Sequence, residues 1–214
     1  MRLSVRKARG ADQRTLAVLR QLCGWCLQYP DESVLGKLPL FRACLTELDP
    51  ASPGHAELTR TIRYLSGGEP LSLAAHYVEV FERKPRRTLH LSWFTDGDTR
   101  RRGQTLAALK AFYRDHGFVP AENELPDFLP VLLEFAANAV PTAADGLLAR
   151  FTPALRLLHR HLGTLDTPYR DTVAAVLATA PPPDERAAAA LSETGPPAEL
   201  VGLGPYPTGR KEFP

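Results

Sequence analysis

Apolar residues recur every three or four positions along almost the whole chain, and this spacing constrains the fold more than any other feature. Near the N-terminus, for example, the run consists of Leu16, Leu19, Cys23, Cys26 and Leu27. A period near 3.6 places such residues on one face of an α-helix, which must then be buried against other helices. The sequence therefore predicts an all-α protein, built as a compact single-domain bundle of about eight helices.

Proline and glycine mark the expected helix boundaries. Proline is tolerated in the first turn of a helix, and glycine favours the C-terminal end. On these signals we expect helices over about 12–29, 32–48, 52–67, 70–81, 98–116, 126–139, 142–162 and 168–178. Between residues 83 and 94 the helical period fails, and we expect an extended loop, because an isolated strand would have no partner.

The ends of the chain differ in composition from the helical region. Residues 1–11 are basic and predict an N-terminal arm, and residues 12–180 carry the helical pattern. Residues 181–214 hold eight of the 20 prolines and show little apolar periodicity. Such a segment cannot bury enough apolar surface to fold alone, so we expect a Pro-rich, disordered C-terminal tail.

Composition and cysteine content limit the class of protein. A net charge of +2 gives no general argument for nucleic acid. No run of about 18 apolar residues predicts a membrane span, and no signal peptide is recognisable. The three cysteines, an odd number, do not suggest a disulfide framework. The pair Cys23 and Cys26 falls inside a helical pattern, so we interpret both as buried thiols and expect a cytoplasmic protein without a metal site.

No motif of a known catalytic site is present in the sequence. We find no phosphate-binding loop, no Gly-x-Ser-x-Gly turn and no His-Glu-x-x-His helix. A nucleophile, a base and a group that orients the base cannot be assembled from the motifs. The sequence therefore predicts no catalytic residues, and we expect that the protein is not an enzyme.

The segment "TDGDTRRRG", residues 95–103, raises the question of a ligand. A calcium loop is excluded, because Arg100 and Ala107 stand where oxygen ligands would be needed. Asp96 or Asp98 is instead expected to cap the helix that follows. Two interpretations remain open for the nearby arginines. They form a basic patch for an anionic group, or they form a solvated face in which these aspartates pair with some of them; the residues are Arg86, Arg87, Arg100, Arg101 and Arg102.

Acidic residues border the apolar face of the helix expected near residues 126–139. Glu124, Asp127 and Glu134 flank a face that includes Leu132 and Phe135. Such a face can receive a basic amphipathic helix from a partner protein. The alternative is that Asp127 caps the helix and that Leu132 and Phe135 belong to the core.

Two segments resemble a known family. They are "HYVEVFERKPRRTLHLSWFTDGDTRRRGQTLAALKAFYRDHGF" and "ELPDFLPVLLEFAA". Together they resemble the NarJ-type nitrate reductase molybdenum cofactor assembly chaperones, also called delta subunits, of the TorD-like superfamily. The resemblance covers roughly residues 10–180 and is strongest over about 76–137.

The resemblance implies an all-helical, TorD-like, non-catalytic chaperone. It would bind the N-terminal segment of the apo catalytic alpha subunit of respiratory nitrate reductase and keep it competent for insertion of the molybdenum–bis-guanine-dinucleotide cofactor before membrane docking. It would hold no cofactor permanently, and cofactor-delivery proteins are further partners that the resemblance allows. A basic anion- or nucleotide-binding helical module is the alternative function.

The resemblance also assigns site residues. Tyr77 and Phe81 match the aromatic helix of the family, and the "ELPDFLP" segment matches a hinge-like motif in which Phe128 replaces the usual histidine. With the apolar helix face, the expected residues for binding the partner peptide are Tyr77, Phe81, Glu124, Leu125, Pro126, Asp127, Phe128, Leu132 and Phe135.

Overall fold

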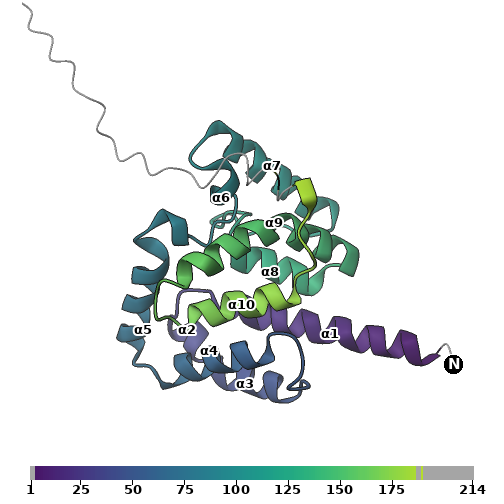
Figure 1. Cartoon of the computed structure of the whole chain (residues 1–214), viewed down its shortest axis with the longest axis vertical. Helices are drawn as coiled ribbons and strands as arrows, with labels where there is room; N and C mark the ends of the chain where they lie inside the picture. Colours follow the sequence, from purple (N-terminus) through teal and green to yellow (C-terminus); the bar gives the residue numbers. More distant parts are fainter. Residues whose placement is uncertain (1–2, 187–188, 190–214) are drawn as a thin grey trace, which may run out of the picture.

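The computed structural model describes residues 3–186 and residue 189, with only the backbone given for residues 3–12. Figure 1 shows that the described chain is a bundle of helices, drawn from purple at the N-terminus to yellow-green near residue 186. Within the described residues there is no β-strand, and the one antiparallel bridge, between His90 and Phe128, is isolated. The expected all-α fold is confirmed. The disorder expected for residues 190–214 lies outside the described residues.

Eight helices of eight or more residues correspond one to one with the eight expected from the sequence. With the four shorter elements included, the helices of the described residues are, in chain order, α1 (Leu3–Cys26), α2 (Glu32–Leu35), α3 (Leu38–Thr46), α4 (His55–Gly67), α5 (Pro70–Tyr77), the π-helix η1 (Val78–Glu82), the 3-10 helix η2 (Pro85–Arg87), α6 (Trp93–Asp96), α7 (Arg100–Asp115), α8 (Leu129–Asn138), α9 (Pro141–Leu162) and α10 (Tyr169–Thr179).

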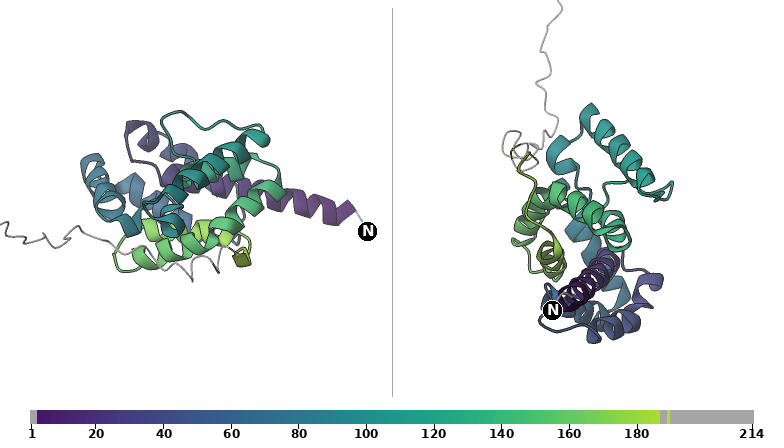
Figure 2. Two further views of the ribbon diagram at one scale, coloured as in Figure 1. Left: turned by 90° about the horizontal axis from the view of Figure 1, so that it is seen from above. Right: turned by 90° about the vertical axis from the view of Figure 1, so that its right-hand side faces the viewer.

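The C-terminal part of α1 lies inside the bundle, whereas its N-terminal part projects from it. It packs on α8 most extensively and also on α10, α4 and α3, and Figure 2 views it nearly end-on with these helices around it. A Cβ atom at Gly24 would lie 3.4 Å from Leu133 Cβ of α8, which is an ordinary van der Waals contact, so α1 and α8 pack directly against each other here. Burial raises the pKa of the Cys26 thiol to about 12. Cys23 and Cys26 are therefore inert, buried thiols, as expected.

Helices α4 and α10 also make a close contact, and a glycine explains it. Gly54, the N-cap of α4, has a φ of 80°, a backbone angle that residues other than glycine rarely adopt. A Cβ atom at this position would lie 2.8 Å from Ala175 Cα. The turn before α4 therefore brings the backbone directly against α10.

Three predicted helices differ from the structure in their boundaries. The helix expected over 32–48 is divided into α2 and α3, because Pro39 must sit in a first turn. The helix expected over 70–81 changes from α to π geometry at Val78. Helix α1 begins at Leu3, nine residues before the expected start. The division into arm, helical domain and tail remains a prediction.

The loop expected over residues 83–94 is more structured than predicted. After η2, the amide of Leu91 donates to Asp127 O (3.0 Å) and the amide of Leu129 donates to Leu89 O (2.9 Å). The alternating segment therefore does have a pairing partner, namely the chain that leads into α8. The sequence could not reveal this, because the partner lies almost 40 residues away.

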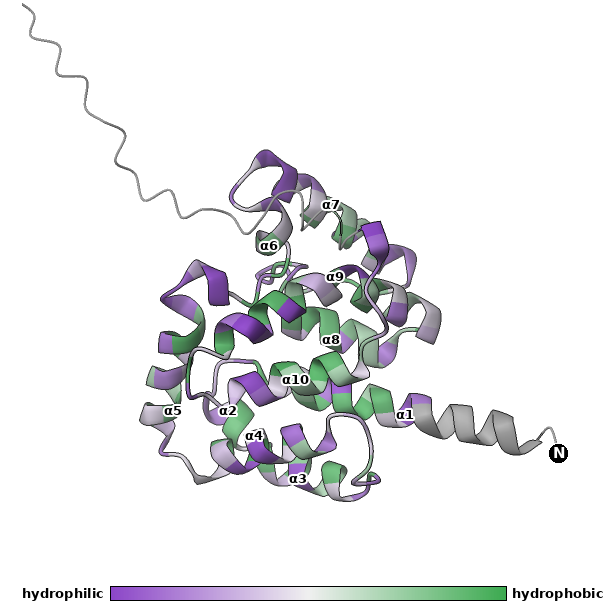
Figure 3. Cartoon of the chain, in the orientation of Figure 1, coloured by the Kyte–Doolittle hydropathy of each residue, from purple (hydrophilic) through white to green (hydrophobic). Residues whose placement is uncertain are grey.

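Hydropathy follows the packing of the bundle. Figure 3 shows the hydrophobic residues gathered where helices face one another, whereas the start of α7 is strongly hydrophilic. Across the described residues, no helix combines the length and hydropathy that a membrane crossing requires. The apolar residues therefore form an internal core, which includes Leu19, Leu27, Leu132 and Leu155.

One buried cation ties four helices together. Arg20 of α1 is only 4% exposed. Its guanidinium donates to Ala136 O of α8 (3.3 Å), to Asp145 Oδ1 of α9 (2.8 Å) and to Thr179 O at the end of α10 (2.8 Å). The carbonyl groups at the ends of α8 and α10 are thereby satisfied by a side chain from a third helix.

We expect Arg20→Ala to lower the free energy of unfolding by about 3 kcal/mol, because two carbonyl groups lose a charged donor and the packed alkyl chain is removed. Urea denaturation followed by circular dichroism would measure the change. Asp145→Asn is the matched control. The Asp145 side chain is 48% exposed, so a change below about 1 kcal/mol is expected there. Equal losses for both variants would contradict this account.

Candidate functional site

A hollow of about 580 Å³ lies between the end of α1, the α5–η1 helix and the segment that leads into α8. We call it the aromatic groove. Its twelve lining residues are Gln28, Tyr29, Asp31, Tyr77, Phe81, Glu82, Pro85, Thr88, Leu89, His90, Glu124 and Phe128. Aromatic rings and three carboxylates predominate, and none of the twelve is lysine or arginine.

Local structure explains how the groove side chains come together. Pro30 follows α1, and Tyr29 and Asp31 stand on the turn there; Asp31 also caps α2 through Val34 N. The π-helix η1 carries Phe81 and Glu82 to the same place. A π turn holds one more residue than an α turn and shifts the side chains that follow it, which is why such turns often occur at functional sites.

The aromatic rings of the groove support one another. The Tyr77 ring lies 5.5 Å from Tyr29 in an edge-on contact and 5.0 Å from Phe81. The Tyr77 hydroxyl donates to Leu27 O (3.1 Å), and burial raises the pKa of Tyr77, so this hydroxyl stays protonated. At the other wall, the His90 and Phe128 rings are 5.2 Å apart. The floor is thus a preformed apolar surface.

Asp127 holds in place the wall of the groove that His90 and Phe128 form. Its side chain is fully buried, and it accepts hydrogen bonds from Ser92 Oγ, Ser92 N and Arg102 Nη2 and pairs with His90 Nδ1 at 3.2 Å. Burial alone would raise the pKa of Asp127, but the hydrogen bonds from His90 and Ser92 and the charges of His90 and Arg102 keep it below its ordinary value. Asp127 is therefore an ionised anchor inside the protein.

A second hollow of about 500 Å³ lies between the end of α7 and α8. Phe118, Val119 and Phe135 form its apolar part, and Glu134 stands beside them. Glu124 lines both this hollow and the aromatic groove. The two hollows are thus neighbours that share one carboxylate.

The structure separates the nine residues expected to bind a partner peptide. Tyr77, Phe81, Glu124 and Phe128 all line the aromatic groove, and Phe135 lines the second hollow. Leu125 is exposed but lines neither of these two hollows.

Tyr77, Phe81 and Phe135 are themselves only 3–5% exposed, and the remaining three of the nine are buried and line neither hollow. They are Pro126, whose carbonyl group accepts from the Tyr113 hydroxyl, Asp127 and Leu132. The assignment of Asp127 and Leu132 to a groove surface is wrong, because both belong to the interior. Asp127 is also not a helix cap, since the N-cap of α8 is Phe128.

The expected basic patch is not assembled. Arg87 is buried and donates to Glu79 O (2.9 Å), and Arg102 is directed to the Asp127 site. Arg101 pairs with Asp96 (3.2 Å). Arg86 and Arg100 are exposed. Arg87 and Arg102 therefore have structural roles, and Arg101 pairs with Asp96 as the alternative of a solvated face expected. The anion-binding interpretation keeps only the exposed Arg86 and Arg100 as unassigned members of the patch.

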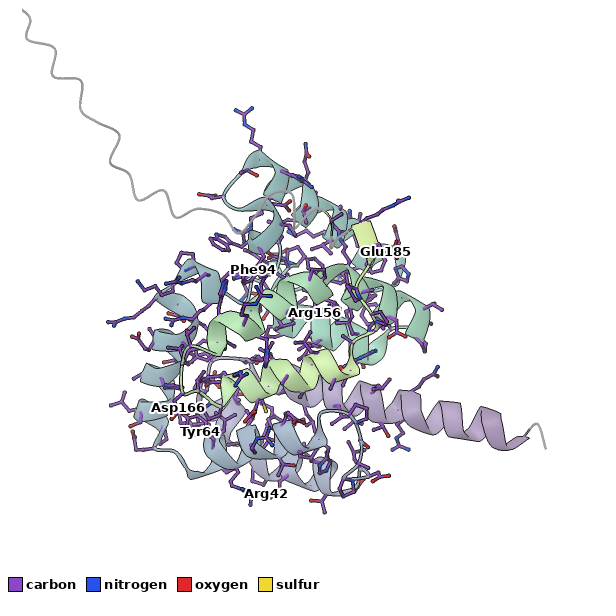
Figure 4. The ribbon with its side chains drawn as sticks, in the orientation of Figure 1. Arg42, Tyr64, Phe94, Arg156, Asp166 and Glu185 are labelled. Carbon is purple, nitrogen blue, oxygen red and sulfur yellow. The ribbon has the colours of Figure 1, made fainter. Side chains whose placement is uncertain are left out.

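The predicted capping role of Asp96 and Asp98 is also wrong. Helix α7 has Thr99 as its N-cap, and within the described chain no hydrogen bond joins either carboxylate to an amide of the first turn of α7. Asp96 instead ends the short helix α6. The Phe94 side chain of α6, labelled in Figure 4, stacks on His161 of α9 with ring centroids 6.3 Å apart. The glycine at position 97 turns the chain between the two helices, so Asp96 faces inward.

Eight of the twelve groove residues were not predicted as site residues from the sequence, and four of these eight are aromatic or ionisable. Tyr29 and Asp31 flank Pro30 just after α1, Glu82 ends η1, and His90 lies in the extended segment. For Tyr29, the sequence offered one signal, namely a tyrosine beside a proline in "QYPDE". The other three become neighbours only through the folding of distant segments.

A family model and several known proteins match the sequence of this chain. The family model described as nitrate reductase delta subunit matches residues 48–174, more than half of the chain. The chain belongs to this delta subunit family. The matched region contains α4 to α9 and most of the groove lining, whereas Tyr29 and Asp31 lie before it.

Individual relatives agree with the family assignment. The chain is 32% identical over 156 residues to the probable nitrate reductase molybdenum cofactor assembly chaperone NarJ of Bacillus subtilis, covering 71% of this chain and 82% of that protein. It is 33% identical over 145 residues to NarJ of Escherichia coli, covering 67% and 61%. The names of these delta subunit relatives describe assembly chaperones and not enzymes, in agreement with the expectation of a non-enzyme.

A longer relative is also similar. The nitrate reductase-like protein NarX of Mycobacterium tuberculosis is 38% identical over 162 residues, which is 76% of this chain and 24% of NarX. The chain thus spans about a quarter of that protein. A delta subunit region can therefore occur within a larger polypeptide.

Proposed function

We propose that the protein is a system-specific chaperone that binds the N-terminal segment of the apo catalytic subunit of respiratory nitrate reductase. The observation that carries this proposal is the aromatic groove, in which four family-assigned residues meet Tyr29, Asp31 and Glu82. Membership in the delta subunit family, and relatives named as assembly chaperones, support the choice of partner.

The chemistry of the groove suits a peptide with apolar anchors and positive charges. Aromatic rings offer large apolar contact surfaces at low entropic cost, and preformed hollows bind without reorganisation. Asp31, Glu82 and Glu124 would attract lysine or arginine side chains and set the direction of the peptide. An amphipathic basic helix lying in the groove meets both requirements.

The chaperone would retain the partner until its cofactor is inserted. In this proposal, binding occurs in the cytoplasm, covers an apolar segment of the immature subunit and delays membrane docking. The molybdenum cofactor would be inserted into the partner, and this chain would hold no cofactor permanently. The role requires binding and release rather than catalysis.

Calorimetry with a synthetic N-terminal peptide of the catalytic subunit tests the proposal. We expect saturable binding at micromolar peptide, weakened at least about tenfold by the double variant Glu82→Lys/Glu124→Lys, since like charges would then face the basic peptide. The absence of saturable binding to the unmodified chain would count decisively against the proposal.

The matched control also replaces two carboxylates by lysine, but at positions outside the groove. Glu47 and Asp166 are exposed and line none of the described hollows. Glu47→Lys/Asp166→Lys should therefore change the affinity by less than about threefold, the scale of an exposed charge pair. Equal weakening by both double variants would indicate general electrostatics and not a groove.

A further inference from the structure

The aromatic groove has a chemistry that fits proline-rich segments as well as helices. Its walls combine Tyr29, Tyr77, Phe81 and Phe128 with nearby carboxylates, and no lysine or arginine is among the described lining residues. Aromatic-lined grooves bind proline-rich segments in the extended polyproline conformation, because that conformation forms with little loss of entropy. Carboxylates at the edge select for adjacent cations.

The C-terminal part of this chain contains a segment with the complementary composition. Residues 204–211 read "GPYPTGRK", with two prolines around Tyr206, then Arg210 and Lys211, and no acidic residue. These residues lie outside the described part of the structure. We propose that this segment docks in the aromatic groove of its own chain and competes there with the partner peptide.

The connecting chain is long enough for this docking. Eighteen residues, 187–204, separate Arg186, the last residue of the continuous described chain, from Pro205. Fully extended, they span about 60 Å. A domain of this length has a diameter of roughly 40 Å, as judged from its expected radius of gyration of about 16 Å. The extended length therefore exceeds the diameter of the bundle.

A tethered segment competes even when its own affinity is weak. Tethering a ligand to its own binding site can raise its effective concentration into the millimolar range. A segment that binds with a dissociation constant of a few tenths of a millimolar would then occupy most of the grooves. The affinity for the partner peptide would be lowered about fivefold. The tail would thus keep the apolar groove covered until the partner arrives.

Competition between the tail and the partner peptide rests on the proposed function, whereas docking of the tail can be tested without it. Nuclear magnetic resonance of the full chain compares wild type with Arg210→Glu/Lys211→Glu. We expect amide signals of His90, Glu124 and Phe128 to shift, and to do so independently of protein concentration. Unchanged groove signals, or shifts confined to other surfaces, would overturn the proposal. Shifts that vanish on dilution would show docking between two chains and would overturn it as well.

Calorimetry with the synthetic partner peptide then measures competition. Arg210→Glu/Lys211→Glu should bind the peptide about fivefold more tightly than wild type. The control Arg42→Glu/Arg63→Glu makes the same charge change at exposed positions outside the groove. Equal tightening in the control, or none in the tail variant, would refute competition. If no variant bound the peptide, the proposed function would fail while the tail docking would still be decided by the resonance shifts.

Discussion

Leu132→Asp is expected to unfold the protein. Leu132 is 0% exposed and packs in the core on α8, the helix on which α1 packs most extensively. The substitution removes apolar contacts worth about 2–5 kcal/mol and buries a carboxylate that has no partner there. Because the whole stability of a domain is only about 5–15 kcal/mol, loss of the native state is the expected result.

Circular dichroism and urea denaturation would measure this effect, and Leu125→Asp is the matched control. Leu125 belongs to the same sequence motif but is 41% exposed. A change in stability of about 0.5 kcal/mol or less is expected there. A Leu132→Asp variant that remained folded and merely bound the partner peptide weakly would restore the original expectation that this residue lines a groove.

Asp127→Ala is expected to lower the free energy of unfolding by about 3 kcal/mol at neutral pH. The variant leaves the buried Ser92 hydroxyl and amide without an acceptor and deprives Arg102, whose side chain is 22% exposed, of its partner. It also frees the segment that holds His90 against Phe128, so affinity for the partner peptide should fall as well. Denaturation and calorimetry measure the two effects separately.

The contribution of Asp127 should depend on pH in a definite direction. Since its pKa is lowered in the folded state, its stabilising effect is present above the unfolded pKa of about 3.9 and is lost as the pH falls through the folded value. The stability difference between wild type and Asp127→Asn should therefore be present at pH values above about 4 and shrink below about pH 4. Asp98→Ala, an exposed site, serves as control. A difference that grew on acidification would refute this interpretation of Asp127.

The sequence allowed the helices to be predicted, because a helix is a local structure. Apolar spacing near 3.6 residues and the positions of proline and glycine depend only on neighbouring residues, and all eight predicted helices occur. The prediction that Asp96 caps α7 was wrong, because the local sequence does not fix the direction of an aspartate side chain. An aspartate before a helix can equally well turn inward, and here Asp96 ends α6 and pairs with Arg101.

The groove could be predicted only in part. Tyr77, Phe81, Glu124 and Phe128 were assigned by resemblance and line one hollow. Asp127, from the same motif as Glu124 and Phe128, and Leu132, from the helix face that follows, line neither hollow. Residues one position apart near the start of a helix point in different directions, and the neighbours of that helix decide which direction is exposed. The sequence did not contain that information in any local form.

The sequence by itself determined the helical class, the positions of the helices, the inert character of the two buried cysteines and the family. Only the tertiary structure decided that Asp127 is an internal anchor, that Arg87 and Arg102 serve the fold, and that Tyr29, Asp31 and His90 face one groove. The physical reason is the range of the interactions. Periodicity and turns arise between residues a few positions apart, whereas burial and pairing arise between segments that meet only when the whole bundle has packed.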